Sequence, residues 1–224
     1  MLDEKLNRHM EDLIKRYHRL GTVRKEIEQA YLMMETCYRN QGKLLIAGNG
    51  GSAADSEHMA GELMKRFRLG RPVSREFAEK LISVDAVRGA VLAEHLEQSL
   101  MAIPLVAHEA LTTAYMNDVD ESGVFAQQLF GYGTAGDVFL GISTSGNSKN
   151  ILHAAVVAHA CGIKVIGLTG GSGGELKRLS DVAVCVPEKE TYLIQELHLP
   201  IYHCWCMMLE ERFFARADDG GKQV

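Results

Sequence analysis

Short apolar segments that alternate with glycine- or serine-rich turns and helical segments decide the fold class of this chain. The apolar segments cover residues 44–47, 137–143, 164–169 and 181–186. Each is short and almost continuously apolar, as expected of a strand that is buried on both faces. Strands that are joined through helices in this order form a parallel sheet covered by helices on both sides. The sequence therefore predicts an α/β fold.

The segments before, between and after these strands are interpreted as helical, and the first of them shows a three-four spacing of apolar residues. They cover residues 3–39 (with a break at Gly21-Thr22), 52–66, 74–101, 124–132, 149–160 and 191–214. Residues 105–107 are a candidate for one further short strand, and Asn117-Asp118 favours a turn. The polar tail, residues 218–224, is expected to fray. A chain of 224 residues with these elements is expected to form a single domain.

Composition and charge exclude several classes of function. The chain is 46% apolar and 24% charged, with a net charge of −5 and no basic block, so binding to nucleic acid has little support. No apolar run approaches the roughly 18 residues of a membrane span. The N-terminus lacks the apolar core of a signal peptide, so a cytoplasmic protein is expected. The five cysteines form no CxxC pair, and we expect buried thiols rather than disulfides.

The stretch from residue 43 to residue 66 contains the first candidate site. Residues 48–51 are Gly-Asn-Gly-Gly, which permit a tight turn and close approach of a ligand to the backbone. Ser52 suits the N-cap of the following helix, whose first N–H groups would attract an anion. His58 and Glu62 are four residues apart, so they share one face of that helix. Taken alone, this pair could equally be two polar residues on a solvated surface.

A second candidate site is the run Ser-Thr-Ser-Gly-Asn-Ser at residues 143–148, between a predicted strand and a predicted helix. Hydroxyl groups and the N–H groups of a helix start can hold a phosphate without a lysine or arginine. The density of hydroxyls exceeds what a helix cap needs, so phosphate binding is favoured over a simple cap. Neither glycine-rich stretch matches a Walker or a Rossmann fingerprint. Residues 170–174 are interpreted as a turn.

The final helix carries Gln195, Glu196, His198 and His203 among apolar residues. Polar groups in such a stretch need partners if they are buried. Any one of these histidines, considered alone, is more often a hydrogen-bonded core residue than a ligand. Their combination with the motifs above is what carries a functional interpretation.

Four motifs together resemble the SIS (sugar isomerase) domain family, and more closely its phosphoheptose isomerases. These motifs are Gly-Asn-Gly-Gly-Ser, His58-x-x-x-Glu62, Ser-Thr-Ser-Gly-Asn-Ser, and Ile-Gln-Glu-x-His with His203 five residues later. The resemblance covers roughly residues 40–70 and 104–214. It implies a five-stranded parallel sheet in a three-layer αβα sandwich, similar to flavodoxin and Rossmann folds. It also implies one SIS domain over residues 1–224, with N-terminal helices (1–40), an added helical segment (72–102) and the tail.

The resemblance further implies an activity and a set of roles. Phosphoheptose isomerases interconvert sedoheptulose 7-phosphate and D-glycero-D-manno-heptose 7-phosphate through an enediol, the first step of nucleotide-activated heptose synthesis. Glu62 would be the base and His203 the acid, and zinc would be bound by His58, Glu62, Gln195 and His203. Substrate would contact the following residues: Asn49, Gly50, Gly51, Asn117, Asp118, Ser143, Thr144, Ser145, Ser148 and Gln195. The family assembles as a homotetramer.

Helix geometry adds a constraint on these roles. Gln195 and His203 are eight residues apart, roughly 12 Å along one helix axis. Both can bind one metal only if they lean strongly inward or come from different subunits, so we expect a site at a subunit interface.

Two alternative functions stay open. The first is a non-catalytic SIS adaptor similar to the DnaA initiator-associating protein, which lacks the acidic residue and the second histidine of the isomerase pair. The second is an isomerase of another phosphosugar, which the added segment 72–102 leaves possible. Because this chain has both Glu62 and His203, the enzyme is favoured.

Overall fold

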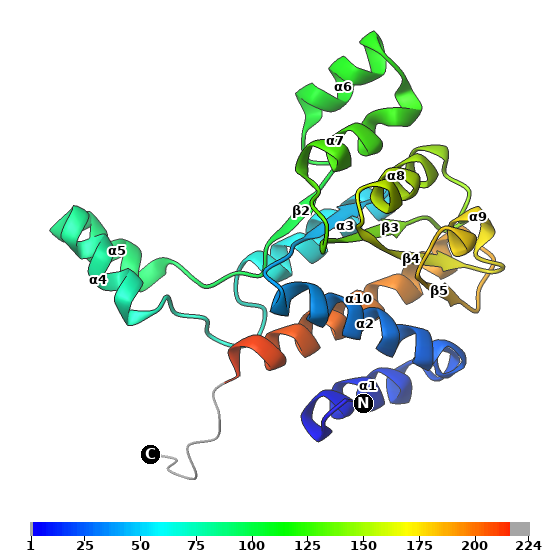
Figure 1. The fold of residues 1–224 in the computed structure, drawn as a ribbon. Helices are drawn as coiled ribbons and strands as arrows, with labels where there is room; N and C mark the ends of the chain where they lie inside the picture. The colour runs from blue at the N-terminus through cyan, green and yellow to red at the C-terminus, as the bar shows by residue number, and fades with distance from the viewer. Residues whose placement is uncertain (1, 216–224) are drawn as a thin grey trace.

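A computed structural model describes residues 2–215, and Figure 1 shows a single sheet of five parallel strands surrounded by helices. The strands are β1 (Leu44–Ala47), β2 (Ala102–Pro104), β3 (Val138–Ile142), β4 (Lys164–Gly170) and β5 (Val182–Val186). Their order across the sheet is β2-β1-β3-β4-β5, and every neighbouring pair is parallel. The predicted α/β fold with a five-stranded parallel sheet is confirmed.

Helices cover both faces of the sheet and make it the middle layer of three. Leu44 and Ile46 of β1 point into one core, with α2 (Arg24–Arg39), α3 (Gly51–Met64) and α10 (Thr191–Phe214). Leu45 and Ala47 point into the other core, with α7 (Val124–Tyr132), α8 (Lys149–Ala160) and α9 (Gly174–Arg178). This alternation follows from the two-residue period of a strand. Helix α1 (Glu4–Arg16) packs outside α10 (Figure 1).

The added segment folds as two short helices that stand apart from the sheet. Helices α4 (Arg75–Val84) and α5 (Ala86–His95) form a hairpin that projects from the body in Figure 1. The prediction of helix up to residue 101 was too long. The chain breaks at Asp85, whose side chain caps α5, and residues 96–101 return to the sheet in a non-helical conformation.

The edge strand and one turn also differ from the prediction. Strand β2 is formed by residues 102–104, not 105–107, and Pro104 is tolerated because β2 is an edge strand. Leu105 is buried in the second core instead of continuing the strand. Asn117 and Asp118 form no separate turn, because they are the last residues of α6 (Glu109–Asp118). The remaining helices are two short 3₁₀ segments, His18–Val23 and Glu121–Gly123.

Other expectations agree with the structure. Helix α8 begins and ends where predicted, and α7 ends at Tyr132 before Gly133. All five cysteines are free thiols, of which Cys37, Cys204 and Cys206 are buried and the other two partly exposed. No helix within residues 2–215 combines the length and apolarity that a membrane crossing requires. The predicted frayed tail, residues 218–224, lies outside the described residues.

The strand order places a crevice beside the carboxyl ends of β1 and β3. The chain proceeds from β1 outward to β2 on one side and to β3, β4 and β5 on the other. In open parallel sheets, ligands bind outside the carboxyl ends of the strands where the order reverses. Residues 48–51 follow β1 and residues 143–148 follow β3, so both candidate loops lie at this point.

Candidate active site

A pair of asparagine side chains joins the two loops across the crevice. The Asn49 amide nitrogen donates to Asn150 Oδ1, and the Asn150 amide nitrogen donates back to Asn49 Oδ1, each at 2.9 Å. Asn150 lies in the first turn of α8. The sequence motifs did not identify Asn150, because only the fold brings residues 101 positions apart into contact. The pair fixes Asn49 at the mouth of the crevice.

The loop of hydroxyls after β3 is held in a defined shape. Ser143 Oγ and Ser148 Oγ are hydrogen-bonded at 2.9 Å, and the Asn147 N–H donates to Ser145 Oγ at 3.2 Å. Helix α8 begins after Ser148 without a side chain from the N-cap residue bonded to it, and the N–H groups of residues 149 and 150 form no described hydrogen bond. The loop thus combines several hydroxyls with the positive end of a twelve-residue helix.

The glycine-rich stretch at residues 170–174 packs against the hydroxyl loop. Gly146 has a φ of +67°, and a Cβ there would lie 2.0 Å from the carbonyl oxygen of Gly173. A larger residue at position 146 would therefore push the two loops apart. Thr144 and Ser145 also line an open cavity of about 600 Å³ together with Gly171, Ser172 and Lys189. The predicted turn is confirmed for residues 171–173, since Gly170 ends β4 and Gly174 begins α9, and the turn also lines this cavity.

The first turn of α3 differs in detail from the prediction. Ser52 is not the N-cap, because the helix begins at Gly51 after Gly50, whose φ of +56° only glycine adopts easily. The Ser52 carbonyl accepts a hydrogen bond from Ser56 Oγ inside the helix. Gln195 of α10 packs directly on this turn, since a Cβ on Gly51 would lie 2.6 Å from its Nε2. Gln195 therefore lies at the glycine turn, close to Gly50 and Gly51.

Two histidines and a glutamate meet further along α3 and α10. His58 Nε2 is 3.3 Å from Glu62 Oε1 and 3.4 Å from His203 Nε2. Glu62 Oε2 is buried and has no hydrogen-bond partner in the described structure. Burial lowers the pKa of His203, and the adjacent His58 lowers it further, so its imidazole is neutral at pH 7. The structure thus brings together three of the residues assigned to chemistry and metal binding.

Asp55 and Tyr202 extend this cluster, and the sequence motifs did not identify either residue. The Tyr202 hydroxyl donates to Asp55 Oδ1 at 3.0 Å and lies 3.1 Å from His58 Nδ1. Burial raises the pKa of Asp55, and the Tyr202 hydrogen bond opposes that shift. Burial also raises the pKa of Tyr202, and the negative charge of Asp55 raises it further. Tyr202 contacts the histidine nitrogen that does not face His203, so it orients the His58 ring.

A buried ion pair supports the end of α3 that carries Glu62. Arg71 and Glu210 are each 1% exposed, and Arg71 Nε donates to Glu210 Oε1 at 2.9 Å. Arg71 also donates to the carbonyl oxygens of Leu63, at 2.8 Å, and Glu62, at 3.2 Å. Glu210 accepts the N–H groups of residues 67 and 68, and Phe67 packs against the His203 ring. This ion pair therefore fixes the backbone on both sides of the cluster.

His198 is a core histidine rather than part of the cluster. It is fully buried, its Nε2 lies 3.3 Å from the Thr169 carbonyl oxygen, and its Nδ1 has no described partner. Burial lowers its pKa to about 4. The Thr169 hydroxyl in turn donates to the Thr144 carbonyl at 3.4 Å. His198 thus contacts the strand end that supports the hydroxyl loop.

Asn117 and Asp118 are not joined to the other predicted site residues. They are exposed at the end of α6, and their only described side-chain hydrogen bond is the one between them, at 2.8 Å. Gln195 likewise forms no described hydrogen bond to His58, Glu62 or His203. Within residues 2–215, no group of three or more His, Cys, Asp and Glu side chains is arranged to hold a metal ion. The predicted four-ligand set is therefore not assembled within one chain.

An open cavity of about 760 Å³ adjoins His203 on the side away from the sheet. It is lined by residues of α1, the 67–68 segment and α10, including Lys15, Arg16, Phe67 and Arg68. His203 therefore faces open space on one side and His58 on the other. A ligand or a second subunit can approach the cluster from this cavity.

Comparison with known proteins places the chain in a family. A sequence model of the SIS domain family matches residues 8–100 and 92–170. Phosphoheptose isomerase from Aneurinibacillus thermoaerophilus is 39% identical over 188 residues, 84% of this chain and 82% of that protein. The structure of phosphoheptose isomerase GmhA from Neisseria gonorrhoeae is similar, with a TM-score of 0.71 and 32% identity. That similarity covers 94% of this chain and all of the other.

A phosphoheptose isomerase structure from Francisella tularensis gives nearly the same result, with a TM-score of 0.70 and 31% identity. It also covers 94% of this chain and 100% of the other. These matches favour the enzyme over the adaptor. The chain therefore belongs to the SIS domain family, within its phosphoheptose isomerase branch, and is an isomerase.

Proposed function

We propose that this isomerase converts sedoheptulose 7-phosphate into D-glycero-D-manno-heptose 7-phosphate, with Glu62 as the base and His203 as the acid. The observation that carries the proposal is the unpartnered, buried Glu62 Oε2 beside the His58–His203 pair. A buried carboxylate oxygen without a partner is costly unless a ligand completes it. The names of the relatives support the substrate.

The chemistry requires a proton to move between two neighbouring carbons. Glu62 would remove the proton from C1 of the ketose and return it to C2, with an enediol between the two steps. Neutral His203 would donate a proton to the carbonyl oxygen and take one back from the neighbouring hydroxyl. His58 contacts both Glu62 and His203. Tyr202, itself bonded to Asp55, would hold His58 in position.

The phosphate group would bind at the hydroxyl loop. Ser143, Thr144, Ser145 and Ser148 supply hydroxyls there, and the α8 N-terminus favours an anion. Asn49, Gly50, Gly51 and Gln195 would contact the sugar, since Asn49 is paired with Asn150 at the start of α8 and Gln195 contacts Gly51. Asn117 and Asp118 lie apart from these groups in the chain, and we propose that they contact substrate only in an assembled oligomer.

Zinc is proposed as the metal by family resemblance, and two distances around His58 agree with it, although the described part of one chain does not assemble a complete set of ligands. In a tetrahedral zinc site with Zn–N bonds of 2.0–2.1 Å, neighbouring ligand atoms are about 3.3 Å apart. His58 Nε2 is separated from Glu62 Oε1 and His203 Nε2 by 3.3 and 3.4 Å. When bound, zinc would supply a Lewis acid that polarises the substrate carbonyl.

Within one chain the Gln195 side chain packs on Gly51. A Gln195 that binds zinc would therefore come from a second subunit. We therefore propose a homo-oligomer, by family resemblance a tetramer, with the site at a subunit interface. The open cavity beside His203 gives room for such a partner.

The test is turnover of sedoheptulose 7-phosphate with and without zinc by the wild type, Glu62→Gln and His203→Gln. Each substitution should lower kcat/KM by about 100-fold or more, the usual contribution of one acid or base. Glu57→Gln, on an exposed position of the same helix, is the matched control and should keep wild-type activity. No turnover by the wild type in any metal condition would contradict the proposed substrate. Full activity of both variants would discard the acid–base pair.

The zinc proposal has a separate readout. Metal analysis of protein purified without chelator should give about one zinc per chain for the wild type. His58→Ala should lower that content and its affinity for added zinc about 10-fold or more. Equal zinc content in both proteins would rule out His58 as a ligand, whatever the activity.

A further inference from the structure

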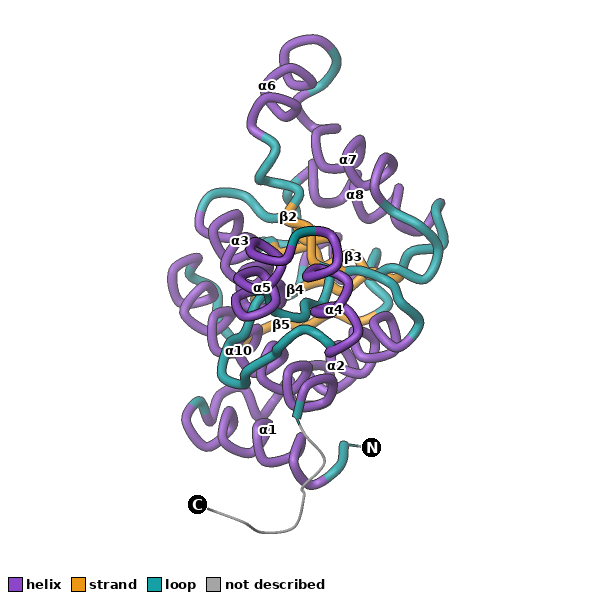
Figure 2. The backbone as a smooth tube through the Cα atoms, turned by 90° about the vertical axis from the view of Figure 1, so that its left-hand side faces the viewer, coloured by secondary structure: helices purple, strands orange, loops and turns teal. Residues whose placement is uncertain are grey.

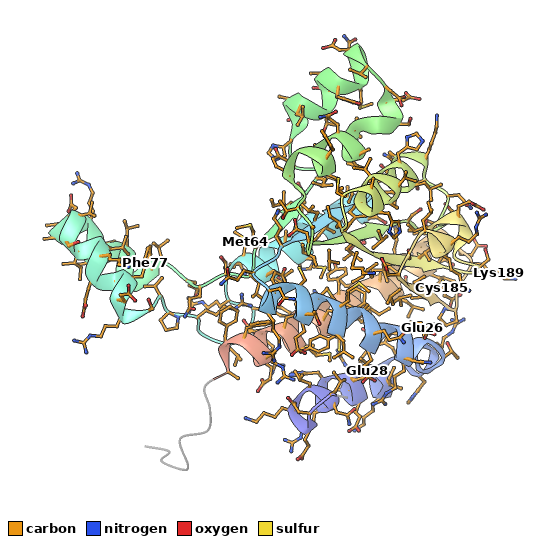
Figure 3. All side chains as sticks on the ribbon, viewed as in Figure 1. Glu26, Glu28, Met64, Phe77, Cys185 and Lys189 are labelled. Carbon is orange, nitrogen blue, oxygen red and sulfur yellow. The ribbon has the colours of Figure 1, made fainter. Side chains whose placement is uncertain are left out.

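The helical hairpin formed by α4 and α5 has apolar side chains that no other part of the chain within residues 2–215 covers. No residue of α4 is buried, and in α5 only Gly89 is buried. The two helices pack on each other and form no extensive contact with any other described element. Figure 3 shows the labelled Phe77 on the hairpin, well separated from Met64 at the end of α3.

The exposed residues of the hairpin include several large apolar side chains among charged and small ones. The large apolar ones are Phe77 (46% exposed), Ile82 (44%), Val84 (88%), Val87 (77%), Val91 (54%), Leu92 (42%) and Leu96 (40%). A groove of about 440 Å³ runs between the two helices and is lined by Phe77, Leu81, Val84 and Leu92 with the aliphatic stems of charged neighbours. Two ten-residue helices without a buried core are marginal in water, so this surface needs a partner.

The base of the hairpin is rigid, so the surface is presented in a fixed direction. Residues 72 and 97 form an antiparallel bridge, and the Gln98 N–H donates to the Arg71 carbonyl at 2.7 Å. Arg66 forms an ion pair with Glu97 at 3.1 Å. Within the hairpin the helices cross closely, because a Cβ on Gly89 would lie 2.2 Å from the Leu81 carbonyl oxygen. Figure 2 shows the hairpin in front of the sheet, apart from α6 and α7.

We propose that this surface, the α4–α5 hairpin, packs on the same hairpin of a second copy of the chain to form a four-helix bundle. Two hairpins related by a two-fold axis enclose a common apolar core, as in four-helix bundles. If all seven side chains were covered, and a fully exposed one presents roughly 150–250 Å², the exposed fractions would correspond to at most about 700 Å² per copy. That area is close to the roughly 800 Å² that each partner of a stable interface contributes.

The charges of the hairpin favour a second copy over a partner of opposite charge. Its charged side chains already pair within their own helices, as Arg75–Glu79, Lys80–Glu76 and Arg88–Asp85. Among the charged residues of α4 and α5, all within the described part, only Glu94 forms no ion pair. A surface with internally balanced charge and an apolar face is suited to contact its own copy.

The test compares Val84→Glu with Ser83→Glu, which adds the same charge at a neighbouring exposed position outside the groove lining. Light scattering after size-exclusion chromatography gives the mass in multiples of 24.7 kDa. A carboxylate in the proposed apolar core should weaken self-association by roughly 100-fold or more. We therefore expect Val84→Glu to have half the wild-type mass and Ser83→Glu to keep it.

Hydrogen exchange provides a second measurement on the same proteins. Amides of residues 75–95 should exchange slowly in the wild type and within seconds in Val84→Glu, while those of β1, β3 and β4 stay protected in both. The proposal is overturned if Val84→Glu has the same mass as the wild type. It is also overturned by a hairpin that exchanges rapidly in the wild type, or by one that becomes protected only when lipid vesicles are added. None of these outcomes depends on the activity of the enzyme.

Discussion

His203 and His58 face each other across the contact between α10 and α3, with their Nε2 atoms 3.4 Å apart and their rings nearly perpendicular, at 80°. In this geometry at most one proton can lie between the two facing nitrogens. The other side of His58 is held by Tyr202 and Asp55. The pair is therefore oriented before any ligand binds, and the following predictions depend on it.

Tyr202→Phe should lower kcat by about tenfold with little change in KM. The substitution removes the hydroxyl that contacts His58 and leaves the packing of the ring intact. Steady-state kinetics measure the effect, and Tyr192→Phe, on an exposed tyrosine of the same helix, is the control. An unchanged kcat in Tyr202→Phe would show that the hydroxyl does not position His58.

Ser145→Ala should weaken substrate binding by roughly 10- to 100-fold, because a hydrogen bond to a charged group contributes about 1.5–3 kcal/mol. Calorimetric titration of sedoheptulose 7-phosphate into Glu62→Gln and into the double variant separates binding from turnover. Ser99→Ala, at an exposed position away from both loops, serves as the control. Equal affinities would place the phosphate elsewhere.

Glu210→Gln should lower the free energy of unfolding by about 3–5 kcal/mol, since it leaves the buried Arg71 without its counter-charge. The Gln amide would also direct donors at the N–H groups of residues 67 and 68. Urea unfolding measures the change. Glu79→Gln, which breaks an exposed pair with Arg75, should cost less than about 0.5 kcal/mol. Similar losses in both variants would contradict a special role of the buried pair.

The burial of His198 makes stability depend on pH in a defined window. Its pKa is about 4 in the folded chain against about 6.5 when unfolded. The unfolded state therefore binds the proton first as the pH falls. The corresponding stabilisation, on the order of 3 kcal/mol, is complete above pH 6.5 and is lost progressively as the pH falls to about 4.

The measurement for His198 is the melting temperature at pH 7.5 and pH 5. The decrease between these values should be smaller in His198→Gln, whose amide can still donate to the Thr169 carbonyl. His159→Gln, a partly exposed histidine of α8, is the control and should behave like the wild type. A pH dependence that is identical in all three proteins would remove His198 as the cause.

The fold could be predicted where the pattern of apolar residues is strong and local. Helix α8 is predicted with its stop at Gly162, and four strands follow from short apolar runs. The edge strand β2 could not be placed because Ile103 and Leu105 are both apolar, and only pairing with β1 decides between them. Likewise, nothing local shows that Asp85 divides the added segment into a hairpin.

The site could be predicted only in part. The motifs identified Glu62, His58 and His203, because these residues lie on helices with chemically unusual composition. Asp55 and Tyr202 have ordinary neighbours in the sequence, and only the packing of α3 on α10 shows their contact. The placement of Gln195 at Gly51 also depends on that packing. Residues that act through another residue are set by tertiary contacts, which a single sequence does not reveal.

The central claim is tested most directly by the reaction in D₂O. Wild-type enzyme with sedoheptulose 7-phosphate should yield aldose phosphate of which a part contains solvent deuterium at C2, because the proton held by Glu62 can exchange with solvent before it is returned to the enediol. Glu62→Gln should form this product at a rate lowered by about 100-fold or more, while Glu57→Gln should match the wild-type rate. Product that forms at the wild-type rate in Glu62→Gln would contradict the mechanism.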